Sequence, residues 1–310
     1  MRVCDQVLEV ATKTFVKLAL DTCIGSMLSS LDGYYYAGAS KRVFEFVVSN
    51  FDIRQLIALR RLIVCVADRA LYNWFHLLQS TDEIQLLITP EGTQEPINLT
   101  TCAPHLPHCL FSSVGWIAKH SSLDRPYAWA QKTLSLLDDC KKAPVAPLQL
   151  PPLPDFPDPK VEWYGRTAHQ QAAMDKFGFW LMRVVRDKTM DEWLSLLAGQ
   201  EPNPADVWLA MQVRSMPEGW AELLQQARQL EEDVVFDMML NTVDGLLHFS
   251  LYDIDALSEY AIVVKTPLGQ VDDLTRVPML VNLAAELYGD EGWIARFSRY
   301  PRASVDRDAQ

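Results

Sequence analysis

Several motifs that carry nucleotide and hydrolase chemistry are missing from the sequence. It has no phosphate-binding Gly-x-x-x-x-Gly-Lys, no dinucleotide-binding Gly-x-Gly-x-x-Gly after a strand, no Gly-x-Ser-x-Gly and no His-Glu-x-x-His. Glycine is scarce as well, with 13 in 310 residues, so the chain lacks the glycine-rich loops that nucleotide enzymes commonly use. These absences argue against the common nucleotide-dependent and hydrolytic enzymes, although an active site can also be assembled from scattered residues.

The chain also lacks long hydrophobic runs, and its second half lacks cysteine. No apolar run is long enough to span a bilayer, and charges interrupt the N-terminal segment, so we expect neither a membrane span nor a signal peptide. The six cysteines lie at positions 4, 23, 65, 102, 109 and 140. A disulfide framework common to both halves is therefore excluded, and we expect reduced, mostly buried thiols in a cytoplasmic protein.

Acidic residues outnumber basic residues in the second half of the chain only. Residues 1–150 contain 14 acidic and 14 basic side chains, whereas residues 151–310 contain 26 acidic and 14 basic, so the net charge of −12 comes from the second half. Duplex nucleic acid and anionic membranes both require positive charge, so we exclude them as partners of that half. The acidic half fits a basic protein partner, because complementary fields speed association, but the charge could also serve solubility alone.

One seven-residue segment occurs twice. GWIAKHS at 115–121 recurs as GWIARFS at 292–298, a shift of 177 residues, and the turn TPEG at 89–92 recurs as TPLG at 266–269 at the same shift. Weaker similarity continues at a shift of 176 further back and at a shift of 166 near the start of each half. The pattern predicts a tandem duplication of one unit, with about ten extra residues inside the second copy.

Proline marks the boundary between the two copies. Seven of the 18 prolines lie between positions 144 and 159, a segment that can neither propagate a helix nor pair regularly in a sheet. Its apolar residues suggest that it lies along a surface. We therefore predict one copy at 1–142, a proline-rich linker at 143–165 and the second copy at 166–310, each copy long enough for its own core.

The apolar spacing within each copy is mostly that of helices. We expect helices over 168–197 (broken near 187–190), 217–252 and 40–78, and short strands at 84–88 and 260–264, each followed by a turn and a second short strand. The fold class is thus α+β, predominantly helical, with a small β-hairpin in each of two similar domains. A lone hairpin is marginal, so each should pack on a long helix or pair with the other; pairing implies a pseudo-twofold arrangement.

The most metal-like group of side chains is Cys102, His105, His108 and Cys109. Thiols and imidazoles are suitable zinc donors. The corresponding positions of the second copy are Met279, Asn282, Ala285 and Glu286, which do not preserve the set. We therefore expect no metal and no cofactor, and keep these four residues as the candidates for a metal-assisted alternative.

Carboxylates recur along one face of the predicted long helix in the second copy. Asp233, Asp237 and Asp244 are spaced four and seven residues apart, so they share a face. This face is the candidate binding surface, and a plain solvated face is its alternative. Asp244 has a counterpart in Asp68 of the first copy, and such a carboxylate can also bond a buried donor.

The repeated Gly-Trp segments invite a binding role for Trp116 and Trp293. Both copies keep the tryptophan, while His120 of one copy becomes Phe297 in the other. Packing of a large aromatic side chain on the core explains this pattern better than recognition does.

These observations predict a non-catalytic cytoplasmic binding protein, of the kind represented by an immunity protein or antitoxin that neutralises a basic effector. Two alternatives stay open. One is an enzyme with a site in the cleft between the copies, with metal assistance or a carboxylate pair. The other is a regulatory or scaffold protein that assembles through one copy and recognises a target through the other.

Overall fold

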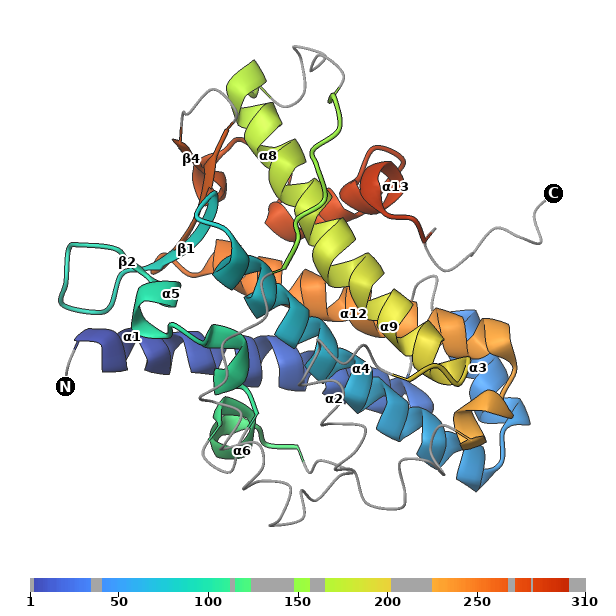
Figure 1. The fold of residues 1–310 in the computed structure, drawn as a ribbon. Helices are drawn as coiled ribbons and strands as arrows, with labels where there is room; N and C mark the ends of the chain where they lie inside the picture. The colour runs from blue at the N-terminus through green and yellow to red at the C-terminus, as the bar shows by residue number, and fades with distance from the viewer. Residues whose placement is uncertain are drawn as a thin grey trace.

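The computed structural model is predominantly helical, with one small antiparallel sheet at the side of the molecule where the N-terminus lies (Figure 1). It describes residues 3–34, 41–111, 115–123, 148–156, 165–201, 225–266, 271–279 and 281–300. The predicted fold class, a helical α+β protein, is confirmed.

The first half begins with one continuous rod, in which α1 (Val3–Thr12), the π-helical η1 (Lys13–Leu20) and α2 (Asp21–Leu31) follow each other without a break. The remaining elements are α3 (Lys41–Asn50), α4 (Ile53–Ser80), β1 (Ile84–Ile88), β2 (Ile97–Asn98), α5 (Leu99–Cys102), the 3-10 helix η2 (Leu106–Cys109) and α6 (Trp116–His120). One helix was expected over 40–78, and two are found. Asp52 separates α3 from α4, because it is the N-cap of α4. Its carboxylate accepts hydrogen bonds from the backbone N–H groups of Arg54 and Gln55.

The second half begins with a similar rod, made of α8 (Ala168–Trp180), the π-helical η3 (Leu181–Asp187) and α9 (Lys188–Leu197). The other elements are α12 (Glu232–Ala256), β3 (Tyr260–Lys265), β4 (Val271–Asp273), the 3-10 helices η4 (Leu274–Arg276) and η5 (Leu283–Leu287), and α13 (Trp293–Phe297). The break predicted near 187–190 is wrong, because a π-helical stretch keeps the rod continuous. The predicted start of the long helix at Pro217 lies outside the described residues.

The two hairpins pair with each other, as expected. The strand order is β2-β1-β3-β4, and β1 and β3 are antiparallel with Leu86 opposite Ile262 at the centre. Beyond the strands, the N–H of Thr89 donates to the carbonyl of Glu259 and the N–H of Lys265 donates to that of Glu83, both over 2.8 Å. This register is symmetric: adding 176 to the residue number in β1 and subtracting 176 from that in β3 turns each outer pair into another pair and leaves the central pair Leu86–Ile262 unchanged.

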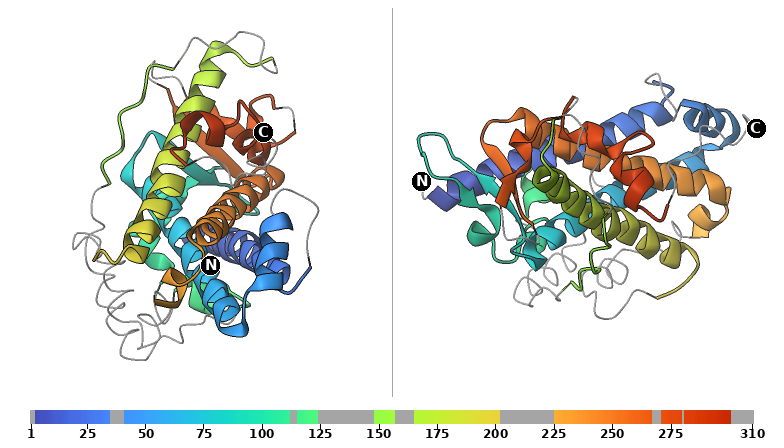
Figure 2. Two further views of the ribbon diagram at one scale, coloured as in Figure 1. Left: turned by 90° about the vertical axis from the view of Figure 1, so that its right-hand side faces the viewer. Right: turned by 90° about the horizontal axis from the view of Figure 1, so that it is seen from above.

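The core runs across both halves of the chain. α4 packs against α12, and each long helix also packs against the opening rod of the other half (Figure 2). The buried apolar side chains form one continuous cluster. The domain boundaries at 142 and 166 stay a prediction, but the two halves share this cluster. α12 is apolar and long enough to cross a bilayer, yet 67% of its most apolar window is buried inside the fold.

Residues 148–156, from the proline-rich linker, lie against the second half. Leu148, Leu150 and Leu153 pack on the core, and the indole of Trp180 donates to the carbonyl of Pro151 over 3.1 Å. For these residues, the prediction that the linker follows a surface is confirmed.

Candidate functional site

The repeated Gly-Trp segments act as packing anchors. Trp116 is 8% exposed and Trp293 is 1% exposed, so the packing interpretation is confirmed. The glycine before Trp293 is required by a close approach, since a Cβ atom at Gly292 would lie 2.2 Å from the carbonyl oxygen of Tyr288.

The serine that ends each repeated segment bonds an aspartate at the end of a π-helix. In the first half, Asp21 accepts from Ser121 Oγ and from the N–H of Ser122, both over 2.6 Å. In the second half, Asp187 accepts from Ser298 Oγ over 2.5 Å and from the N–H of Arg299 over 3.0 Å. This Asp-Ser clasp ties the last segment of each half to its opening rod.

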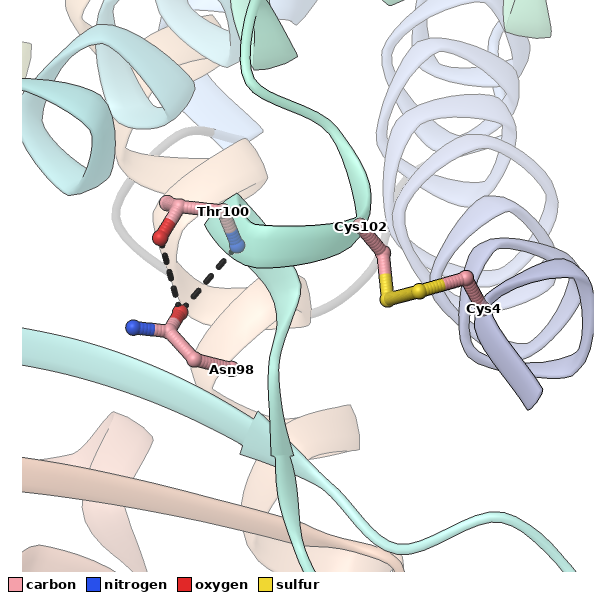
Figure 3. Close-up of a disulfide and its surroundings, with 4 residues drawn as sticks. All are labelled: Cys4, Asn98, Thr100 and Cys102. Atoms are coloured by element: carbon pink, nitrogen blue, oxygen red, sulfur yellow. Dashed lines mark hydrogen bonds between the residues drawn. A yellow bond between two sulfur atoms is a disulfide. The ribbon is translucent and has the colours of Figure 1, made fainter.

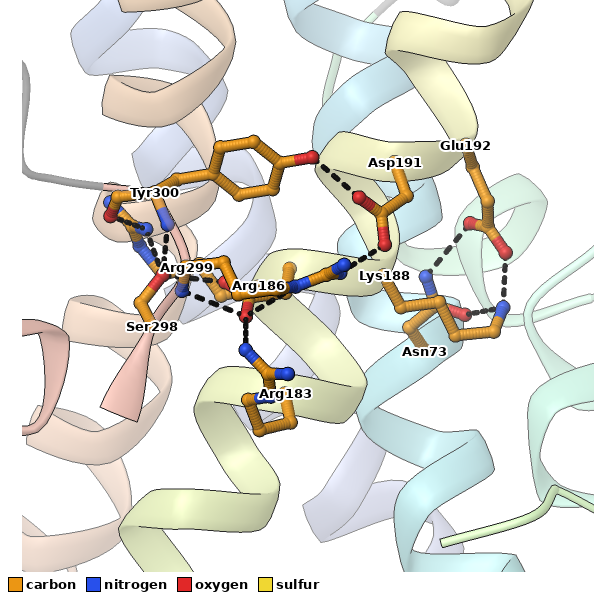
Figure 4. A network of polar contacts seen from close by, with 10 residues as sticks. Asn73, Arg183, Arg186, Lys188, Asp191, Glu192, Ser298, Arg299 and Tyr300 are labelled. Atoms are coloured by element: carbon orange, nitrogen blue, oxygen red, sulfur yellow. Dashed lines mark hydrogen bonds and ion pairs between the residues drawn. The ribbon is translucent and has the colours of Figure 1, made fainter. Parts of the chain in front are cut away.

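The second half builds a larger polar network around its clasp (Figure 4). Arg186, which is fully buried, forms a bidentate ion pair with Asp244, with distances of 2.6 and 3.1 Å. Its remaining nitrogen donates to Ser298 Oγ and to the carbonyl of Tyr300. Asp191 accepts from the Tyr300 hydroxyl and pairs with Arg299. These contacts fasten residues 298–300 to the rod.

A second group of charges lies where α9 crosses α4. Arg69, 1% exposed, donates through two nitrogens to Glu192, each over 2.7 Å. Lys188 also pairs with Glu192, and Asn73 bridges the two helices. Burial would raise the pKa of Glu192, but Arg69 and Lys188 outweigh it and lower that pKa to about 2. The carboxylate is therefore charged at neutral pH and suited to structural pairing rather than proton transfer.

The predicted carboxylate face does not form one binding surface. Asp233 is exposed at the start of α12 and Asp237 is partly buried, but Asp244 is only 7% exposed and is held by Arg186. The prediction is wrong for Asp244, because a buried arginine from η3 satisfies it. The alternative, a carboxylate bonded to a buried donor, is confirmed at this residue.

The predicted Cys-His group is divided by a disulfide. Cys102 is bonded to Cys4 at the start of α1, with a Cα–Cα distance of 5.2 Å (Figure 3). The expectation of reduced thiols is therefore wrong for this pair, since a bond across 98 residues leaves no local signal in the sequence. Cysteine usage consequently no longer supports a reducing compartment, and a cytoplasmic location stays a prediction.

The other members of the group do not gather around a common centre. His105 and His108 stack with ring centroids 6.0 Å apart, while Cys109 donates to the carbonyl of His105. Within the described ranges, no three His, Cys, Asp or Glu side chains are arranged to hold a metal ion. The metal-assisted alternative would therefore need ligands other than Cys102.

Three rings form a closed cluster in the first half, which we call the first ring cluster: Tyr72, His76 and Phe111. The Tyr72 ring centroid lies 5.8 Å from that of His76 and 6.1 Å from that of Phe111, and all three side chains are buried. The guanidinium of Arg69 lies over the Tyr72 ring at 4.5 Å. Buried His108 lies close enough to His76 to interact with it electrostatically, and η2 packs against α4.

The second half carries three rings at the corresponding positions, which we call the second ring cluster: His248, Tyr252 and Tyr288. His248 lies 6.3 Å from Tyr252 and 5.7 Å from Tyr288. These residues correspond to the first cluster at shifts of 176 and 177. Here, however, Tyr252 is 48% exposed, so the cluster opens to solvent.

The same backbone contact supports both clusters. Gln79 Oε1 accepts from the N–H of Leu106 over 3.1 Å in the first half, and Asp255 Oδ2 accepts from the N–H of Leu283 over 3.4 Å in the second. Both pairs again correspond at shifts of 176 and 177. The second half therefore places a carboxylate where the first half has a neutral amide.

Perturbed titration behaviour concentrates near the open cluster. Burial lowers the pKa of His248, and burial also raises the pKa of Asp255 against the opposing hydrogen bond from Leu283. One turn away, burial raises the pKa of Asp253 to about 6. Desolvated ionisable groups beside an exposed aromatic side chain mark a candidate binding site, and we take the second ring cluster with Asp255 as that candidate.

His248 and His76 are not among the site residues predicted from the sequence. The available signal was the spacing itself, since Tyr72, His76 and Gln79 and their counterparts His248, Tyr252 and Asp255 follow one helical stripe in each copy. Comparisons with protein-family models, with curated proteins and with solved structures find no match for this chain.

Proposed function

We propose that the two halves are diverged copies of one unit, arranged about a pseudo-twofold axis through the centre of the sheet. The symmetric register of β1 and β3, the two Asp-Ser clasps and the two ring clusters all support this origin. Each opening rod also contains a π-helical stretch at a similar position. Functional differences are then expected where the copies differ.

We further propose that the chain is a non-catalytic binding protein that docks a basic protein partner on the α12–η5 surface of its second half. An immunity protein or antitoxin acts in this way on a basic effector. The observation that carries the proposal is the second ring cluster. An exposed tyrosine that stacks on His248, which in turn contacts Tyr288, and that is flanked by a carboxylate has the composition of an interface anchor, where Tyr is enriched.

The distribution of charge supports a basic partner. Most described basic residues of the second half are used in internal ion pairs, as with Arg166–Glu286, Arg186–Asp244 and Arg296–Asp175. Many of its acids instead remain at the surface: Glu201, Glu231, Glu232, Asp233, Asp290 and Glu291. Internal pairing of the cations therefore leaves an anionic exterior, which favours association with a positively charged surface.

The test begins with a photo-crosslinking residue at Val281, which is 71% exposed and precedes η5, in the full chain within its own cells. Ile53, 69% exposed at the start of α4, is the matched control position. We expect a basic protein captured at Val281 but not at Ile53. The purified partner should then bind the Tyr252→Ala variant at least tenfold more weakly, as measured by calorimetry.

Affinity should also fall steeply as salt concentration rises, and less steeply for the Asp290→Asn, Glu291→Gln variant. An acidic partner, or a basic partner that binds Tyr252→Ala as tightly as the original chain, would contradict the proposal.

A further inference from the structure

We propose that the second ring cluster binds a guanidinium group, supplied by an arginine side chain of the basic partner. This inference rests on the proposed function and adds the chemistry of the contact. The ligand-binding surface consists of Tyr252, His248 and Tyr288, with Asp255 at its edge.

The first half already contains such an arrangement within its own fold. The guanidinium of Arg69 lies 4.5 Å from the centre of the Tyr72 ring and donates two hydrogen bonds to Glu192. A planar cation is thus held between an aromatic face and a bidentate carboxylate, the geometry that favours arginine over lysine.

The second half has rings at the same positions, with His248 in place of Tyr72 and Tyr252 in place of His76, but it has no arginine in place of Arg69. Gly245 corresponds to Arg69, and a Cβ atom there would lie 3.3 Å from Cys23 Sγ, so α2 packs close to the helix at this point. Across the described ranges, no lysine or arginine lies over the Tyr252 ring, whereas other aromatic rings carry cations from their own chain. The described part of the chain therefore leaves the half-exposed Tyr252 ring accessible to a cation from another molecule.

Three substitutions between the halves change the cluster from closed and neutral to open and acidic. Asp255 replaces Gln79, so a carboxylate lies in the same helical stripe as Tyr252. Asp253 replaces Leu77 in the neighbouring turn. Ala285 takes the place of buried His108, which lies close enough to His76 to interact with it electrostatically. Loss of this bulky ring and gain of negative charge both favour an incoming cation.

Asp255 is suited to complete the site. Its Oδ2 accepts from the N–H of Leu283, which fixes the carboxylate, and no other described residue donates to its Oδ1. A guanidinium stacked on Tyr252 could donate to this second oxygen. Because burial raises the pKa of Asp255 and a cation stabilises the ionised carboxylate, binding should strengthen as the pH rises and Asp255 loses its proton.

The test uses the full chain labelled with 3-fluorotyrosine and observed by fluorine NMR. The Tyr252 resonance is assigned by its loss in the Tyr252→Phe variant, which keeps the ring. Nα-acetyl-arginine amide is titrated against two controls, the lysine analogue and the citrulline analogue, which is neutral with nearly the same shape. We expect a saturable shift of the Tyr252 signal with a millimolar Kd for arginine, and binding at least tenfold weaker for citrulline.

Two variants sharpen the result. Ala285→His places at position 285 the bulky ring that His108 provides in the first half. It should block access to Tyr252 and so abolish the fluorine shift, while leaving the three rings of the cluster unchanged. Asp255→Asn should weaken arginine binding several-fold and remove most of its pH dependence. Tyr252 is exposed, so the Tyr252→Ala variant should fold. It serves as a second variant that should not bind the arginine analogue.

Equal shifts with arginine and citrulline, or tighter binding of lysine or tetramethylammonium than of arginine, would overturn the guanidinium assignment. If no small cation binds while Tyr252→Ala still weakens the partner, this inference fails and the proposed function stands. If arginine binds but the partner ignores Tyr252→Ala, the cation site stands and the proposed docking surface fails.

Discussion

α4 and α12 carry the same stripe of ring positions, but the first half closes its stripe and the second half exposes it. His76 is 8% exposed, whereas Tyr252 at the corresponding position is 48% exposed. Both clusters rest on the same backbone contact, to Leu106 in one half and to Leu283 in the other. One scaffold can therefore place an aromatic group either in the core or at the surface, depending on a few surrounding side chains.

Each opening rod crosses the long helix of the other half, and these two crossings also differ from each other. At the α9–α4 crossing, Arg69 and Glu192 are buried as an ion pair. At the α2–α12 crossing, Cys23 lies close to Gly245, and its thiol donates to the carbonyl of Thr242. The first crossing depends on charge and the second on close approach of small residues. Substitutions at these positions should therefore have very different energetic consequences.

The largest expected effect comes from removing a charge at the α9–α4 crossing. Glu192→Gln keeps the shape of the side chain but leaves the buried Arg69 cation without its carboxylate. We expect a loss of about 3–5 kcal/mol in the free energy of unfolding, the usual cost of breaking a buried pair. Chemical denaturation at neutral pH measures it.

Cys23→Ala is the matched variant at the α2–α12 crossing, where only a small apolar contact and a weak hydrogen bond are lost. It should cost about 1 kcal/mol. Equal losses for the two variants would show that the charged crossing does not depend on the Arg69–Glu192 pair.

The next effect concerns His108, the buried histidine near the first ring cluster. Burial, together with the neighbouring His105 and His76, lowers the pKa of His108 to about 4, compared with about 6.5 for the unfolded chain. The unfolded state therefore binds the proton more readily, so stability is complete above pH 6.5 and is lost as the pH falls towards 4. The loss should reach about 3 kcal/mol.

Urea unfolding at pH 7.5 and pH 4.5 measures this dependence. His108→Gln should reduce the difference between the two pH values, while His120→Gln, at an exposed position on α6, should leave it unchanged. An unchanged acid response in His108→Gln would place the sensitive group elsewhere.

Local and repeated features could be predicted from the sequence. The strand at 84–88 is found as predicted, the strand at 260–264 is one residue longer, and the burial of Trp116 and Trp293 follows from their retention in both segments. Alternating apolar residues and a shared turn suffice for such predictions, because they depend on neighbours within a few positions.

Pairs distant in sequence could not be predicted in the same way. Nothing near Cys4 indicates Cys102, and nothing near Asp244 indicates that Arg186 will reach it from η3. These contacts depend on how the rods cross, which composition and periodicity leave open. The ring clusters lie between these cases, since their spacing is visible in the repeat but the exposure of Tyr252 depends on packing against η5.

The smallest predicted effect is a gain in stability. It concerns Asp253, a carboxylate without an acidic counterpart in the first half. Asp253 takes the place of the buried Leu77, and burial raises its pKa to about 6, compared with about 3.9 for the unfolded chain. The folded state therefore binds the proton more tightly, so stability falls as the pH rises from 4 to 6. Above pH 6 the carboxylate is ionised, its Oδ2 atom is buried, and no described donor reaches that atom.

Asp253→Asn removes this cost. The variant should gain about 1–2 kcal/mol in the free energy of unfolding at pH 8 and nothing at pH 4, a range reduced because the side chain is only partly buried. Asp290→Asn, at an exposed position in the same half, should change neither value. A gain at pH 4 as large as that at pH 8 would mean that the asparagine improves packing and that the charge of Asp253 carries no cost. A gain confined to high pH would instead show that the second half keeps a carboxylate at the expense of stability, as expected when acidic groups are retained for binding rather than for packing.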